Sequence, residues 1–189
     1  MNWSDPRMAD PETAHERLNH IRLLAMDVDG VLTDGKILLA ADGSETKQFN
    51  IQDGLGIRLA LLGGITVVWI SGRSSPTVER RAEELGVTHL FESARNKSAV
   101  IAELLGQYAL TQSNVAYVGD DLNDLPAFSL AGVKFAPSDA ITEIKALADF
   151  VTERRGGDGA VREVCDVILK AQEKWNDAVT RYLAELLNI

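Results

Sequence analysis

The chain lacks several features that mark particular classes of protein. Its 189 residues include one cysteine, Cys165, so no internal disulfide can form. No apolar run approaches the roughly 18 residues that a transmembrane helix needs. Basic residues are scarce, with 19 Lys and Arg against 28 Asp and Glu, and the net charge of −9 argues against binding to nucleic acids or anionic membranes. The first 20 residues are polar and acidic, unlike a signal peptide, so we expect a cytoplasmic protein.

The composition is otherwise typical of one folded domain with short appendages. Hydrophobic residues make up 46% and charged residues 25% of the chain, which is enough apolar material for a core. We expect a polar arm at 1–20, a domain at 21–173 and a helical tail at 174–189. The tail has apolar residues near helical spacing, and it either packs on its own domain or docks on a neighbouring subunit.

Short apolar segments alternate with helical patterns along the domain. Such alternation predicts an α/β fold, a Rossmann-like parallel sheet with helices on both faces and right-handed crossovers. A turn signal at Ala41–Ser44 predicts a small β-hairpin at 36–49. The predicted strands are 21–26, 65–71, 88–93, 115–120, 132–137 and 149–152, and the predicted helices are 53–62, 76–85, 97–108, a short one ending at 130, 140–147 and 160–174.

The segment 21–35 contains the most informative pattern. An apolar run ends in two carboxylates, Asp27 and Asp29, followed by Gly30. A carboxylate at the edge of an apolar core is costly unless a cation or hydrogen bonds compensate it, and Mg²⁺ prefers such oxygen ligands. An ordinary acidic turn or helix cap after a strand is the alternative interpretation of this segment alone.

Three later strands also end in residues suited to chemistry. Ser71 and Arg73 flank a glycine after the second core strand, and Lys97 begins a helix after the third. The fourth strand ends in Asp120 and Asp121, with Asp124 one helical turn further on. The carboxyl ends of parallel strands meet at one edge of a sheet, so carboxylates could share a Mg²⁺ ion there while Ser71 and Lys97 hold an anion. Phosphoryl transfer needs such an arrangement.

These motifs, DVDGVLTDG, ISGR, a lone lysine and GDDLNDLP, resemble the motif set of the haloacid dehalogenase superfamily of phosphohydrolases. The resemblance implies that Asp27 is a nucleophile that forms an aspartyl-phosphate and that Asp29 is the general acid and base. It also implies a Mg²⁺ ion held by Asp27, the backbone carbonyl of Asp29, and Asp120. Ser71 and Lys97 would hold the phosphate.

Two further acidic residues follow the last motif. Asp121 and Asp124 are expected to orient the metal site or cap the following helix rather than to bind the metal directly.

The chain is too short between its motifs for the cap domain that covers most active sites in this superfamily. About 40 residues separate Asp29 from Ser71, and a hairpin and one helix fill them. Residues 21 to about 173 more closely resemble the capless, tetrameric phosphatases that act on 3-deoxy-D-manno-octulosonate 8-phosphate in lipopolysaccharide precursor synthesis. We therefore expect an enzyme acting on a small anionic sugar acid phosphate, assembled as a homo-oligomer, with a neighbouring subunit helping to exclude water.

That closer resemblance implies a set of substrate-binding residues, some of them contributed across a subunit interface. Arginine forks suit the carboxylate of a sugar acid better than a point charge does. The loop before Lys97, residues 92–96, departs from the pattern because it lacks a glycine often found there. The implied substrate-binding residues are Asp29, Asn50, Ile51, Gln52, Asp53, Gly54, Arg58, Ser71, Arg73, Arg81 and Lys97.

Other functions remain open at this point. A phosphatase for a nine-carbon sugar acid phosphate is the nearest alternative, although Arg73 and Glu84 favour the eight-carbon substrate by the same resemblance. A phospho-acceptor signalling module would carry its acceptor aspartate after the third strand, without an acid two residues later. A non-catalytic sugar-phosphate binding protein would be expected to lose Asp27 or Asp29, and both are present.

Overall fold

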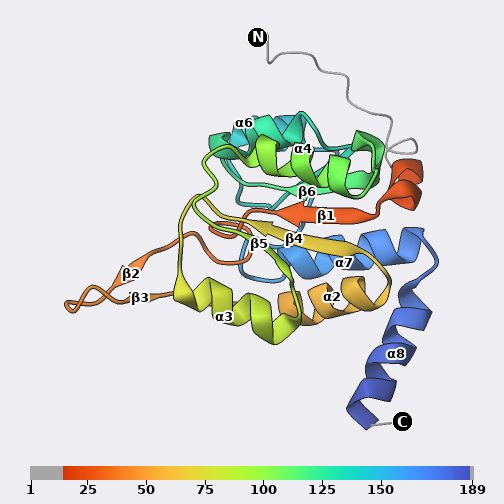
Figure 1. Ribbon diagram of the computed structural model, residues 1–189, viewed down its shortest axis with the longest axis horizontal. Coiled ribbons are helices and arrows are strands. Elements are labelled where there is room, and N and C mark those ends of the chain that lie inside the picture. Colours follow the sequence, from red (N-terminus) through yellow and green to blue (C-terminus); the bar gives the residue numbers. More distant parts are fainter. Residues whose placement is uncertain (1–14, 188–189) are drawn as a thin grey trace.

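Six parallel strands form the central sheet of the computed structural model, which describes residues 15–187 (Figure 1). The strand order is β5-β4-β1-β6-β7-β8, and every neighbouring pair is parallel. The predicted α/β fold is therefore confirmed. The strands are β1 (Leu23–Met26), β4 (Thr66–Ile70), β5 (His89–Phe91), β6 (Val115–Val118), β7 (Val133–Ala136) and β8 (Phe150–Val151).

Helices cover both faces of the sheet, because successive side chains of each strand point to opposite faces. Met26 and Trp69 pack in the core beneath one face, whereas Ala25 and Ile70 pack in the core beneath the other. Within the described residues, no helix is both long and apolar enough to span a membrane. One face carries α2 (Ile51–Leu62), α3 (Pro76–Leu85) and α7 (Ala160–Ala171), and the other carries α4 (Lys97–Gln107) and α6 (Thr142–Leu147), with the short α5 (Leu125–Phe128) packed beside α4 (Figure 1).

The predicted hairpin is present and extends away from the body of the molecule (Figure 1). Its strands β2 (Leu38–Leu39) and β3 (Glu45–Thr46) are antiparallel and only two residues long each. Leu38 and Leu39 are 61% and 69% exposed. The hairpin is thus a slender arm whose apolar side chains contribute little to the core of this chain.

The two ends of the domain are more firmly packed than the sequence suggested. Of the predicted polar arm, residues 1–14 lie outside the described residues, but Leu18 is fully buried in the core and Arg17 bonds Asp149 at 2.6 Å. At least Leu18 of the predicted polar arm therefore belongs to the core. A short 3-10 helix, η1 (Leu18–His20), precedes β1. Leu18 anchors this segment in the core, and the polar composition of the arm concealed that apolar contact.

The helix predicted at 160–174 is α7, which ends at Ala171, and the predicted helical tail is α8 (Trp175–Leu187). The first half of α8 packs on its own domain, where Ala178 is buried together with Leu59 and Leu169. Leu186 and other leucines near the end of α8 are exposed. The first alternative for the tail therefore holds for this half, and docking of its end on a neighbouring subunit stays a prediction.

Helix α2 begins two residues earlier than predicted, because Asn50 caps it by accepting a hydrogen bond from the backbone N–H of Gln52 at 2.7 Å. Asp53 then reaches across to α7, where its carboxylate accepts bonds from the N–H groups of Gly159 at 3.1 Å and Arg162 at 2.7 Å. Burial raises the pKa of Asp53, and these backbone bonds oppose the rise. The side chain therefore acts as an N-terminal cap supplied by another helix.

Replacing Asp53 with alanine should lower the free energy of unfolding by about 1–2 kcal/mol, because two N–H groups at the start of α7 lose their acceptor. Urea denaturation followed by circular dichroism measures the change. Gln52→Ala is the matched control, since Gln52 is exposed on the same turn and should change stability far less. Equal stabilities for the two variants would contradict the assigned cap.

Candidate active site

The carboxyl ends of β1 and β6 bring Asp27 and Asp120 together, as the motif positions predicted. Asp27 is 4% exposed, and one of its oxygens accepts a hydrogen bond from the N–H of Val28 at 2.7 Å. Gly30 lies beside Asp120 with a φ of +92°, and a β-carbon there would collide with the Asp120 carboxylate. Only glycine allows the two acidic loops to approach so closely.

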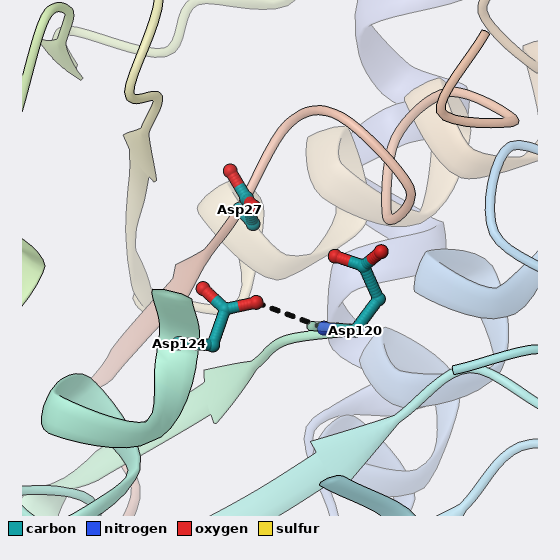
Figure 2. A group of neighbouring side chains, drawn as sticks. All are labelled: Asp27, Asp120 and Asp124. Atoms are coloured by element: carbon teal, nitrogen blue, oxygen red, sulfur yellow. Dashed lines mark hydrogen bonds between the residues drawn. The ribbon is translucent and has the colours of Figure 1, made fainter. Parts of the chain in front are cut away.

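Three carboxylates form a candidate metal centre, with oxygens of Asp27, Asp120 and Asp124 within 4.8 Å of one another (Figure 2). Burial and the nearby Asp124 raise the pKa of Asp27 to about 6, while burial, Asp124 and Asp27 raise that of Asp120 to about 8. Oδ1 of Asp120 is buried without a hydrogen-bond partner in the described part of the chain. A divalent cation would relieve both the repulsion and the unpaired oxygen, so these residues fit Mg²⁺.

The oxygens of Asp124 already have partners within the chain, and its role in orienting the centre stays a prediction. Oδ1 accepts bonds from Lys97 Nζ and from the Tyr117 hydroxyl, each at 2.7 Å. Oδ2 accepts a bond from the N–H of Asp120 at 2.9 Å (Figure 2). The neighbouring Asp121 accepts a bond from the N–H of Leu122 at 2.7 Å and so caps the short helix η3 (Leu122–Asp124).

Lys97 supplies the positive charge of the site. It is 1% exposed at the first position of α4, with Nζ 2.6 Å from Asp27 and 2.7 Å from Asp124. Burial alone would lower the pKa of Lys97, but Asp124 and Asp27 outweigh it and raise the pKa above its usual value. The lysine is therefore held as an ammonium directly beside the carboxylate of Asp27.

The loop after β4 and the loop before Lys97, both expected to hold the anion, meet beside this lysine, where the N–H of Ala94 donates to the carbonyl oxygen of Ser71 at 2.9 Å. Ser71 is 2% exposed after β4, and its hydroxyl oxygen accepts a bond from the N–H of Arg73 at 3.1 Å. In the loop before Lys97, Ser93 adopts a φ of +55°, a conformation that favours glycine. The loop thus uses a left-handed backbone position despite its missing glycine. Asp27, Asp29, Gly72 and Arg73 line an open pocket with residues 120–123.

Comparison with known proteins assigns the family. A haloacid dehalogenase-like hydrolase model matches residues 89–164. The 3-deoxy-D-manno-octulosonate 8-phosphate phosphatase KdsC of Escherichia coli K12 is 48% identical over 162 residues, which are 86% of each chain. The chain belongs to the 3-deoxy-D-manno-octulosonate 8-phosphate phosphatase family. It is therefore a hydrolase of the haloacid dehalogenase-like type, as the motifs predicted.

Solved structures of the phosphatase family share the fold. The Moraxella catarrhalis enzyme was crystallised with magnesium, phosphate and a molecule of 3-deoxy-D-manno-octulosonate (KDO). Its structure has a TM-score of 0.86 and 40% sequence identity to this chain, and the match covers 90% of this chain and 98% of that one. The cobalt-bound enzyme of Haemophilus influenzae has a TM-score of 0.81 at 42% identity, covering 84% and 93%. The similarity to metal-bound relatives agrees with the acidic centre found here.

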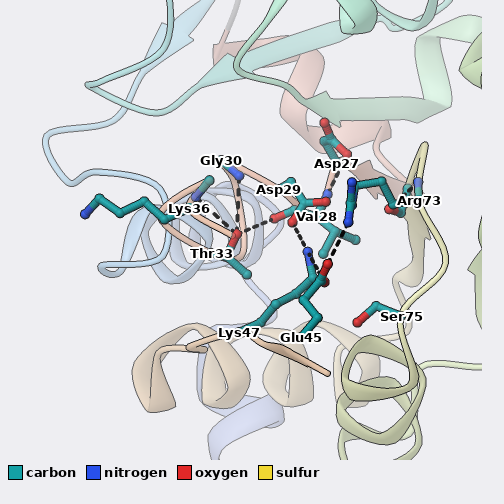
Figure 3. A network of polar contacts seen from close by, with 12 residues as sticks. Asp27, Val28, Asp29, Gly30, Thr33, Lys36, Glu45, Lys47, Arg73 and Ser75 are labelled. Atoms are coloured by element: carbon teal, nitrogen blue, oxygen red, sulfur yellow. Dashed lines mark hydrogen bonds and ion pairs between the residues drawn. The ribbon is translucent and has the colours of Figure 1, made fainter. Parts of the chain in front are cut away.

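The hairpin contributes two residues that the sequence analysis missed in this phosphatase site. Lys47 forms an ion pair with Asp29 and lies 3.2 Å from Glu45, whose other oxygen bonds Arg73 at 2.6 Å (Figure 3). Side chains alternate between the two faces of an extended segment, so Glu45 and Lys47 lie on the same face. This spacing was the one sign in the sequence that the two residues act together. Their partners lie in other segments, so the pattern alone did not connect them to the site.

Several residues lie outside this pocket although the family resemblance implies that they bind substrate. Arg81 bonds Glu84 at 2.8 Å and lies against Gly54 on α2. Arg58 pairs with Glu185 of α8 at 2.7 Å. The side chains of Asn50 and of Asp53 serve as helix caps, and Ile51 and Gln52 are exposed on the first turn of α2. Within this chain, the substrate-binding role of these residues stays a prediction.

Replacing Asp120 with asparagine should weaken Mg²⁺ binding by at least about tenfold, because a charged oxygen of the acidic centre is lost. Isothermal titration calorimetry with MgCl₂ measures the affinity. Asp121→Asn is the matched control: it removes the same charge one residue away and retains an N-cap side chain, so it should change the affinity less than about threefold. Similar losses in both variants would indicate a general charge effect and contradict the assigned centre.

Proposed function

We propose that the chain hydrolyses 3-deoxy-D-manno-octulosonate 8-phosphate to the free sugar acid and phosphate, in lipopolysaccharide precursor synthesis. The observation that carries this proposal is the Asp27 carboxylate, which contacts the Lys97 ammonium and belongs to the candidate metal centre with Asp120 and Asp124. Relatives named for this reaction, and a relative crystallised with magnesium, phosphate and KDO, support the substrate.

In the proposed reaction, an Asp27 oxygen attacks phosphorus, and the phosphorus bond to the sugar oxygen breaks. Asp29 protonates the departing alkoxide and then takes a proton from the water that cleaves the aspartyl-phosphate. Lys97, 2.6 Å from Asp27, helps to keep the nucleophile ionised and faces the transferred phosphoryl group. Mg²⁺ held by Asp27, the Asp29 carbonyl and Asp120 would neutralise charge on the phosphoryl oxygens.

The sugar acid would be recognised at the mouth of the pocket. Arg73 is half exposed there and would offer a fork for the substrate carboxylate, while the Ser71 hydroxyl, which is buried, would hold the phosphate. The pocket is open and no cap domain within residues 15–187 covers it, so we propose that other subunits of a homotetramer close it. Residues 50–54, Arg58 and Arg81 would belong to such a shared site. We also retain the proposal that the enzyme acts in the cytoplasm.

A nine-carbon sugar acid phosphate is the second candidate substrate. The eight-carbon acid is favoured because Arg73 lines the pocket and Glu84 carries a negative charge beside Arg81. A phosphatase for the longer acid would be expected to reverse the charges at positions 73 and 84.

Phosphate release with Mg²⁺ from the eight-carbon and nine-carbon sugar acid phosphates, assayed side by side, tests the proposal. We expect a higher kcat/KM for the eight-carbon substrate, and we expect Asp27→Asn or a chelator to reduce the rate by at least about a thousandfold, since the nucleophile or its counter-charge is lost. Preference for the nine-carbon acid phosphate would support the same mechanism but overturn the proposed substrate. Activity that survives in Asp27→Asn would overturn the proposal.

A further inference from the structure

Lys47 occupies an unusual place for a lysine. It follows β3 in a hairpin whose other side chains are largely exposed, yet its own side chain has no exposed area. Lysine is rarely buried to this extent, since desolvating an ammonium costs several kcal/mol unless anions compensate. Two carboxylates do so here, Asp29 from the loop after β1 and Glu45 from β3.

The contacts of Lys47 fix the direction of the Asp29 carboxylate. Nζ pairs with Oδ1 of Asp29, and Oε1 of Glu45 lies 3.2 Å away on its other side. The second oxygen of Glu45 bonds Arg73 at 2.6 Å, so four side chains of alternating charge run from the loop after β1 to the loop after β4 (Figure 3). Asp29 is 24% exposed and lines the pocket, which leaves its second oxygen available to a bound molecule.

We propose that Lys47 is a positioning residue for the general acid and base: its buried ammonium holds the Asp29 carboxylate toward the oxygen of the leaving group. Glu45 in turn holds Lys47 and Arg73, so the hairpin sets the geometry of proton transfer and of the substrate arginine together. This inference rests on the role of Asp29 in the proposed function. It goes beyond that role because it assigns the orientation of Asp29 to a hairpin residue.

The inference predicts a dependence on the leaving group that a purely structural role would not produce. An alkoxide leaving group needs a proton from Asp29, whereas p-nitrophenolate leaves without one. The ratio kcat/KM reports the steps up to aspartyl-phosphate formation, and so excludes the later attack of water. A misdirected Asp29 should therefore slow the reaction of the sugar acid phosphate and spare that of p-nitrophenyl phosphate.

The test compares Lys47→Met, which keeps the apolar stem and removes the charge, with wild type on both substrates. We expect kcat/KM to fall by about 10- to 100-fold for the sugar acid phosphate and by less than about threefold for p-nitrophenyl phosphate. Lys36→Met is the matched control, because Lys36 forms only an exposed pair with Asp34 at the base of the same hairpin. It should leave both ratios unchanged. Lys47→Arg, which keeps a charge, should recover part of the loss. If Lys47→Met does not fold, Lys47→Arg tests the inference by a smaller loss that is still selective for the sugar acid phosphate, and an equal loss on both substrates overturns it.

Asp29→Asn, measured in the same way, separates the two proposals. If Asp29→Asn slows the sugar acid phosphate selectively and Lys47→Met slows both substrates equally, Lys47 is structural and the inference is overturned. If Asp29→Asn itself shows no selectivity, the acid and base role of Asp29 fails, and the positioning role fails with it. Selective loss in both variants supports the inference.

Discussion

Mutual repulsion among buried carboxylates is the constraint on which the site depends. Asp27, Asp120 and Asp124 lie within 4.8 Å of one another because the parallel strands β1 and β6 end side by side. Lys97 offsets part of this charge through contacts of 2.6 and 2.7 Å, yet the pKa of Asp27 remains at about 6 and that of Asp120 at about 8. The protein thus maintains a site that a cation would complete, and full ionisation of Asp120 at neutral pH depends on that completion.

A second, outer set of charges follows a different rule. Around Asp29, each charged side chain contacts one of opposite sign, from Asp29 through Lys47 and Glu45 to Arg73. This set is balanced without a metal, whereas the inner set is not. The inner set has to bind a cation and a phosphoryl group. The outer set has to keep its geometry while these groups bind and leave.

The sequence was sufficient to predict the sheet and the inner site, because both have local signatures. Asp27 follows a short apolar run, Lys97 starts a helix, and parallel strands must gather such ends at one edge. The contacts of Lys47 with Asp29 and of Asp53 with Arg162 span 18 and 109 residues, and neither has a local pattern. Such pairs depend on how the hairpin and the helices pack on their neighbours. Neither the helix or strand propensity of a residue nor the spacing of apolar residues encodes that packing. Leu18 was missed for the same reason.

The start of α2 shows how a segment implied to bind substrate divides its side chains between two tasks. Asn50 and Asp53 serve as caps of α2 and α7, whereas Ile51 is 84% exposed and Gln52 also faces solvent. The two oxygens of Asp53 hold the N–H groups of Gly159 and Arg162, and losing these bonds to a ligand would cost about as much as a lost helix cap. Contacts from this segment to a substrate would therefore come mainly from the exposed Ile51 and Gln52 and from the backbone. Because Ile51 and Gln52 do not line the pocket beside Asp27 and Asp29, a site shared between subunits is the arrangement that would use them.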